Sequence, residues 1–176
     1  PSLLTYQINT RTNAGDAEID GLELTYRQSL TFLPRWARGL QVFVNYTKLN
    51  LGGNNASDFS GYNPKSLSGG VNFIRGRLFV RTTYSYQGET RRTAIAPSVA
   101  GGIPPDTYNY QARQSRVSVN AQYTLSRNLS LYGSVSDVGG FDELVTAFAP
   151  GTPEYAKGRR LKNLGYYTTI GIKGAF

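Results

Sequence analysis

A basic run near the end of the chain is the densest group of side chains that could do chemistry. It consists of Lys157, Arg159, Arg160 and Lys162. Guanidinium and ammonium groups pair with phosphate oxygens, so the run could hold the phosphates of a lipid or of another anionic ligand. The alternative is a solvated loop of like charges, which is the interpretation that we favour for the run by itself.

A second group of candidates flanks the polar segment 91–107, where arginines and tyrosines alternate with loop residues. Arginine and tyrosine suit binding sites because both give a large contact area and directed hydrogen bonds, although loop composition alone often produces the same mixture. The candidate ligand-binding residues are therefore Glu89, Arg91, Arg92, Tyr108, Tyr110, Lys157, Arg159 and Arg160.

Acidic residues give a third group. Asp16, Glu18 and Asp20 fall on one side of an extended strand, and three oxygen ligands at that spacing could hold a divalent cation. Surface carboxylates near a turn are much commoner, so no metal site is predicted.

Whole classes of chemistry are excluded by composition. The chain contains no Cys and no His, which removes thiolate nucleophiles, disulfides and histidine proton shuttles. The close carboxylates Asp142 and Glu143 are sequence neighbours and would diverge on a strand, so neither an enzyme nor a cofactor is expected. The net charge is +8, but the basic residues do not gather on one helix or patch, so nucleic acid is not expected as a partner.

The elements that must position these residues are strands, because apolar and polar residues alternate with period two through most of the chain. In the segment 78–87, Leu78, Val80 and Tyr84 point one way, while Arg81 and Gln87 point the other. The sequence predicts an all-β protein with eight strands, at about 3–12, 17–31, 40–51, 66–75, 77–90, 108–125, 128–138 and 164–176.

The predicted connections are unequal. Tight turns at Arg75-Gly76 and Ser126–Asn128 and a modest turn around Pro34 separate long polar segments at 52–64, 91–107 and 139–163. Long strands joined alternately by short turns and long loops are typical of an antiparallel transmembrane β-barrel. In that fold Glu23, Arg27 and Arg81 would face the lumen and could contact a plug.

Alternation alone also fits a soluble carbohydrate-binding β-sandwich, whose apolar face packs inside. Strand length and chemistry favour the barrel, since tyrosines lie near the ends of the apolar rows, as at a lipid–water boundary. A complete eight-stranded barrel acting as an anchor or adhesin is a further alternative. The chain begins at Pro1 and contains no Met, and we interpret it as a piece of a longer or processed protein.

Four motifs, in order, resemble one family. The run N-A-G-D-A-E-I-D-G-L-E-L (13–24) is followed by G-L-Q-V-F-V-N-Y-T (39–47), by L-S-L-Y-G-S-V-S-D-V (129–138) and by the ending Y-T-T-I-G-I-K-G-A-F (167–176). Together they resemble the C-terminal part of the barrel of TonB-dependent outer-membrane receptors. This chain has Asp137-Val138-Gly139 where the family usually reads Asn-Leu-Phe.

The resemblance implies that the chain forms about eight C-terminal strands of a 22-stranded barrel in the outer membrane of a Gram-negative-type bacterium, with a plug domain that this chain lacks. It implies uptake of a ferric siderophore, cobalamin or a glycan. It also implies partners: outer-membrane lipid and lipopolysaccharide, the TonB complex, and the barrel assembly machinery, which would recognise the terminal Phe176. The long loops at 52–64, 91–107 and 139–163 would all be extracellular.

Overall fold

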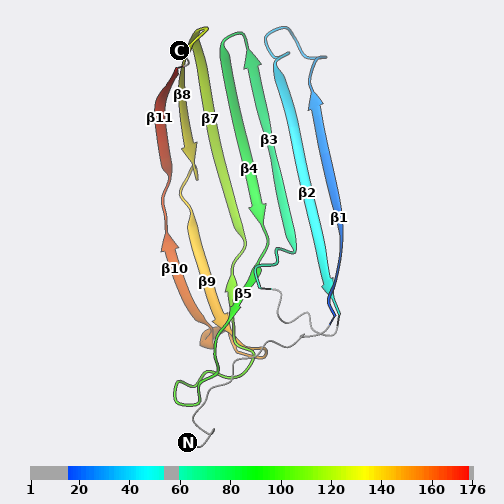
Figure 1. Ribbon diagram of the computed structural model, residues 1–176, viewed down its shortest axis with the longest axis vertical. Helices are drawn as coiled ribbons and strands as arrows, with labels where there is room; N and C mark the ends of the chain where they lie inside the picture. The colour runs from blue at the N-terminus through cyan, green and yellow to red at the C-terminus, as the bar shows by residue number, and fades with distance from the viewer. Residues whose placement is uncertain (1–15, 54–59, 175–176) are drawn as a thin grey trace, which may run out of the picture.

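The computed structural model describes residues 16–53 and 60–174, and in them the chain is all-β, with antiparallel sheets only (Figure 1). The alternation of apolar and polar residues thus correctly predicts an all-β, antiparallel chain. The strands and one short 3-10 helix are β1 (Glu18–Ser29), β2 (Leu40–Gly52), β3 (Lys65–Arg75), β4 (Leu78–Gln87), β5 (Thr90–Ala94), β6 (Tyr108–Gln111), β7 (Gln114–Ser126), β8 (Leu129–Ser136), β9 (Asp142–Phe148), η3 (Glu154–Ala156), β10 (Gly158–Asn163) and β11 (Tyr167–Gly174).

The larger sheet has seven strands in the order β1-β2-β3-β4-β7-β8-β11. Its hairpins at one end are short: β3 and β4 are joined through Gly76 and Arg77, and Ser126 pairs with Leu129 across the β7–β8 turn. Gly76 has a φ of 57°, a left-handed conformation that glycine adopts at little cost in a tight hairpin. The described parts of the long connections lie at the other end, as the sequence predicts (Figure 1).

The smaller sheet has four strands in the order β10-β9-β6-β5. This order repeats the order β11-β8-β7-β4 of the larger sheet, so the smaller sheet continues four strands of the larger one end to end (Figure 1). Each strand is interrupted at the same level, at residues 88–89, 112–113, 137–141 and 164–166. The chain therefore forms one tall layer with a break across four of its strands.

Two sequence predictions are corrected here. The segment 139–163, predicted as a loop, contains the β9–β10 hairpin, and the strands predicted at 77–90 and 108–125 are each divided by the break. Backbone conformation explains part of the difference, because Asp137, Gly139, Gly140 and Gly165 all have positive φ and cannot continue a regular strand. Instead of eight strands, the described residues contain eleven, and the strand predicted at 3–12 lies outside them.

The register of the larger sheet separates the residues into two faces. One, which we call the apolar face, carries rows of aliphatic and aromatic side chains, such as Leu40–Phe73–Val80–Ala121 and Leu24–Tyr46–Leu67–Tyr86. The other, the polar face, carries rows such as Gln41–Asn72–Arg81–Asn120–Ser134.

Neither face is covered by a second layer in the described part of the chain. The buried apolar residues there are few: Ala37, Phe43, Phe141 and Ala149. Val71 and Tyr84 each remain 40% exposed although strands flank them on both sides. The two sheets lie end to end, so the described residues do not form the face-to-face sandwich that the sequence left open. The larger sheet is open, with β1 and β11 each paired on one side only within these residues.

Aromatic side chains on the polar face lie over glycines of the neighbouring strand. A Cβ added at Gly70 would lie 2.9 Å from the Phe43 ring, and one at Gly171 would lie 2.5 Å from the Tyr132 ring. The guanidinium of Arg81 lies 4.8 Å from the centre of the Phe43 ring. Two glycines thus make room for rings that lie along the sheet. No helix in the described residues is long and apolar enough to span a membrane.

Candidate ligand-binding pocket in the four-stranded sheet

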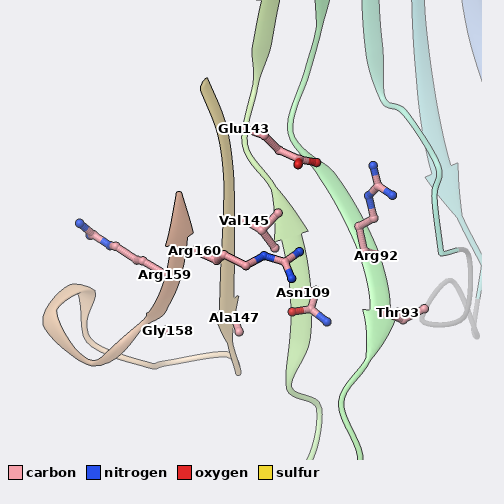
Figure 2. A pocket seen from close by; sticks show the side chains of 9 residues that line it. All are labelled: Arg92, Thr93, Asn109, Glu143, Val145, Ala147, Gly158, Arg159 and Arg160. Atoms are coloured by element: carbon pink, nitrogen blue, oxygen red, sulfur yellow. The ribbon is translucent and has the colours of Figure 1, made fainter. Parts of the chain in front are cut away.

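The pocket lies on one face of the four-stranded sheet and has a volume of about 470 Å³. Figure 2 shows that Arg160 reaches across Val145 toward Asn109, while Arg92 lies on the far side. The pocket is lined by Arg92, Thr93, Asn109, Glu143, Val145, Ala147, Gly158, Arg159 and Arg160. Its lining combines a floor of small side chains with cations at two sides.

Strand pairing explains this composition. Arg160 pairs with Val145, and Val145 pairs with Gln111, so these three positions form one row across the sheet. The next row consists of Gly158, Ala147 and Asn109. Because side chains in one row share a face, two small residues beside Asn109 leave space into which the long Arg160 side chain extends.

In the pocket the acidic side chain has partners, whereas two of the arginines have none within the described residues. Glu143 forms an ion pair with Lys162 at 3.8 Å and accepts a hydrogen bond from Gln111 Nε2 at 3.4 Å. Arg92 and Arg160 make no ion pair or side-chain hydrogen bond within the described residues. The carboxylate is therefore already engaged, and two exposed guanidinium groups are left to meet a ligand. Guanidinium groups bind carboxylates and phosphates with two parallel hydrogen bonds.

The opposite face of the same sheet is aromatic. The rings of Tyr110 and Phe148 stack with centroids 4.1 Å apart. The guanidinium of Arg91 lies 4.8 Å from the centre of the Tyr108 ring, and the ammonium of Lys157 lies 4.4 Å from that of Phe148. These contacts are internal to the sheet and stabilise it through cation–π attraction.

The connection between β9 and β10 contains a small ionic cluster around Glu154 in η3. Its carboxylate contacts Lys157 Nζ at 2.7 Å and Arg159 Nη2 at 2.5 Å. The hydrogen bond and charge of Lys157, with a further contribution from Arg159, lower the pKa of Glu154 below its ordinary value. Figure 2 shows Arg159 directed away from the pocket centre, in agreement with this pairing.

The junction between the two sheets has its own contacts. The guanidinium of Arg116 lies 3.9 Å from the centre of the buried Phe141 ring, and its Nε lies 3.8 Å from Asp137 Oδ1. Gln114 is buried and accepts a hydrogen bond from Arg116 Nη2 at 3.5 Å, while its Nε2 has no hydrogen-bond partner among the described residues. Phe141 is thus one of the four buried apolar side chains in the described residues, and it is held by contacts at the junction.

The eight predicted ligand-binding residues are separated by the structure. Arg92 and Arg160 line the pocket, while Arg91, Tyr108, Tyr110 and Lys157 lie on the aromatic face or contact it. Arg159 borders the pocket but pairs with Glu154, and Glu89 lies exposed in the break between β4 and β5. The basic run is therefore not a loop of like charges, because three of its four members pair with carboxylates.

The other predicted positions are placed as follows. Glu23, Arg27 and Arg81 share the polar face, and Arg81 contacts Phe43. Among the residues that the structure describes, no group of three or more acidic side chains could hold a metal ion, and Asp20 accepts a hydrogen bond from Asn50 Nδ2 at 3.0 Å. Phe176 lies outside the described residues.

Sequence reasoning missed the floor of the pocket. Asn109, Val145, Ala147 and Gly158 come from β6, β9 and β10, and two of these strands lie in the segment predicted as a loop. The run Leu144–Phe148 is rich in strand-forming residues and could have indicated β9.

Comparisons with protein families, with curated proteins and with solved structures find no match to this chain.

Proposed function

We propose that the chain is the C-terminal part of the β-barrel of a TonB-dependent outer-membrane receptor. In this proposal the seven-stranded sheet is a segment of the barrel wall, in a barrel of about 22 strands. The four-stranded sheet rises from it on the extracellular side and contributes to binding a ferric siderophore, cobalamin or a glycan. A plug domain, coupled to TonB, would open the pore.

The observation that carries the proposal is the bare apolar face. From Leu78 to Tyr86, β4 spans nine residues, within the ~9–11 that a tilted strand needs to cross the hydrocarbon of a bilayer. Every second one of them, five in all, lies on the apolar face. In water, an uncovered face of this size would promote aggregation. In lipid, aliphatic side chains are favourable, and tyrosines such as Tyr46, Tyr86 and Tyr123 suit the two boundaries of the apolar region.

Two further features support a barrel. The polar face carries Arg81, Asn120 and other hydrophilic residues in mid-strand, as a water-filled or plugged lumen requires. Within the described residues, β1 and β11 are each paired on one side only, and the free edges require neighbours because backbone groups left unpaired in hydrocarbon cost several kcal/mol each. Additional strands that join the two edges would satisfy them.

Two adjacent threonines allow a matched test of the membrane assignment. Thr82 lies on the apolar face and Thr83 on the polar face, and the chain contains no Cys, so each can be changed to a single spin-labelled cysteine. In the isolated membrane, we expect oxygen, which dissolves in lipid, to relax the label at Thr82→Cys more strongly. We expect a water-soluble nickel complex to relax the label at Thr83→Cys more strongly. Equal exposure of both labels to the nickel complex, or shielding of both from both reagents, would contradict the proposal.

Transport is tested in cells that produce the protein, with and without TonB. Iron-loaded siderophores, cobalamin and oligosaccharides are offered separately, and uptake of one of them is expected only when TonB is present. Arg92→Gln with Arg160→Gln should then weaken binding of an anionic ligand by roughly tenfold or more, because charged hydrogen bonds contribute ~1.5–3 kcal/mol each. Uptake that is independent of TonB would exclude this receptor class.

A further inference from the structure

The apolar face of the larger sheet is bordered by a row of cationic residues, which lies at the level where the two sheets meet. Lys48 pairs directly with Lys65 in the register of β2 and β3, and Leu22 pairs with Lys48 on the other side. The adjoining row is Leu24–Tyr46–Leu67–Tyr86, so the lysines lie one row beyond the aliphatic and aromatic side chains. Both lysines are exposed.

The row continues toward β7. The backbone N–H of Gly88 donates to the carbonyl of Lys65 at 2.7 Å, so a glycine without a side chain follows Lys65 in the row. Gln87 pairs with Gln114, and continuing that register places Arg113, also exposed, across from Gly88. Lys48, Lys65 and Arg113 therefore lie in one row across the sheet, and Gly88, which has no side chain, separates Lys65 from Arg113.

These cations lack acidic partners. None of the ion pairs within the described residues involves Lys48, Lys65 or Arg113. The nearest carboxylate along the face is Asp20, one row further out, and it is engaged by Asn50 Nδ2 at 3.0 Å. The Lys65 ammonium lies 5.9 Å from the centre of the Tyr46 ring, which leaves its charge open to a ligand.

Like charges directly opposite on neighbouring strands destabilise a sheet. Lys48 and Lys65 are such a pair, and an anion between them would relieve the repulsion. At the boundary of an apolar face, the anion that lies next to aliphatic side chains is the phosphate of a lipid headgroup. We propose that Lys48 and Lys65, together with Arg113, bind the phosphate group of a membrane lipid. This inference rests on the membrane assignment proposed above.

The test uses the purified protein in nanodiscs of a zwitterionic lipid. The nanodiscs contain either a lipid A with its phosphates or the same lipid A after enzymatic removal of them. Lipid that stays with the protein after extraction into detergent is measured by mass spectrometry. We expect the phosphorylated form to be retained preferentially, and Lys48→Gln with Lys65→Gln to reduce this preference about thirtyfold, given the attraction of two lysines to an anionic surface.

A matched control is Lys162→Gln with Lys173→Gln, which removes the same charge from the four-stranded sheet and from the polar face. It should retain the lipid as the unmodified protein does. The lysine site would be overturned if both double variants lost the preference for phosphorylated lipid to the same extent. It would also be overturned if the unmodified protein retained the two lipid forms equally. Neither result would affect the membrane assignment. Displacement of the lipid by an equal concentration of inorganic phosphate would indicate a free-anion site and also overturn the proposal. Failure to enter nanodiscs of either lipid would refute the membrane assignment and the site together.

Discussion

The two sheets share four strand paths but differ in what stabilises them. The seven-stranded sheet relies on long, regular ladders and has an apolar face that no described residue covers. The four-stranded sheet has short strands, ion pairs around Glu154 and Glu143, and stacked rings of Tyr110 and Phe148. In the proposed membrane assignment, this change at one level along the same strands marks the boundary between lipid and water.

The largest expected effect separates the stability of the two sheets. Phe141→Ala removes a buried ring from the junction, and a Phe-to-Ala change in a packed site costs about 3–5 kcal/mol. Hydrogen exchange should show faster opening of β9 and β10, while β2 and β3 keep their protection. Phe32→Ala is the control, since Phe32 is 73% exposed, and should change neither sheet. Loss of protection in both sheets together would show that they unfold as one unit.

A charge on the apolar face should have the next largest effect. Val71→Arg places a guanidinium in the middle of that face, where a cation in lipid costs about 2–4 kcal/mol. Leu161→Arg in β10 starts from a side chain that is 65% exposed and should cost about 0.5 kcal/mol or less. The free energy of unfolding in lipid, measured by urea titration, gives the comparison. Similar costs at both sites would argue that the two sheets lie in the same medium.

The contact of Phe43 with Gly70 predicts a smaller effect within the larger sheet. A Cβ at Gly70 would lie 2.1 Å from the Thr82 carbonyl oxygen and 2.9 Å from the ring, so Gly70→Ala should destabilise by about 1–3 kcal/mol through overpacking. At Gly133 the nearest atom would be 3.8 Å away, and Gly133→Ala serves as the control. Thermal unfolding in detergent measures both variants. A more stable Gly70→Ala protein would show that this close approach is not required.

The smallest effect concerns pH in the β9–β10 connection. Because its cationic partners lower the pKa of Glu154 in the folded protein, their stabilisation is present above the ordinary pKa of 4.5 and is lost as pH falls through the lowered value. Acidification below that range should therefore loosen η3. NMR signals of Tyr155 and Ala156 should shift with acid in the unmodified protein and much less in Glu154→Gln. An unchanged titration in that variant would exclude the carboxylate as the cause.

Sequence periodicity predicted the larger sheet well and the smaller one poorly. Along β4, apolar residues such as Leu78, Val80 and Tyr84 lie at even positions on one face, so the faces of the larger sheet could be assigned residue by residue. In the smaller sheet polar residues occur on both faces, as Arg159 and Arg160 illustrate. When both faces carry polar residues, the sequence does not alternate between apolar and polar positions, and the strand cannot be recognised from that pattern.

The candidate site was predicted only in part for a related reason. Arg92 and Arg160 could be selected from their residue type. Asn109, Ala147 and Gly158 line the pocket only because the strand register brings them together. Register between strands that are distant in sequence depends on the break at 137–141, where positive φ values redirect the chain. Single-sequence reasoning has no access to such backbone angles at a non-glycine position like Asp137.

The shared level of the four interruptions also has a mechanical consequence. Regular pairing stops on β4, β7, β8 and β11 at the same height, so a rotation about that line strains fewer ladder hydrogen bonds than a rotation anywhere else along these strands. In the proposed barrel, the smaller sheet would tilt as one unit about this line while the seven-stranded sheet keeps its shape. The width of the opening above the apolar face would then vary without unfolding any strand.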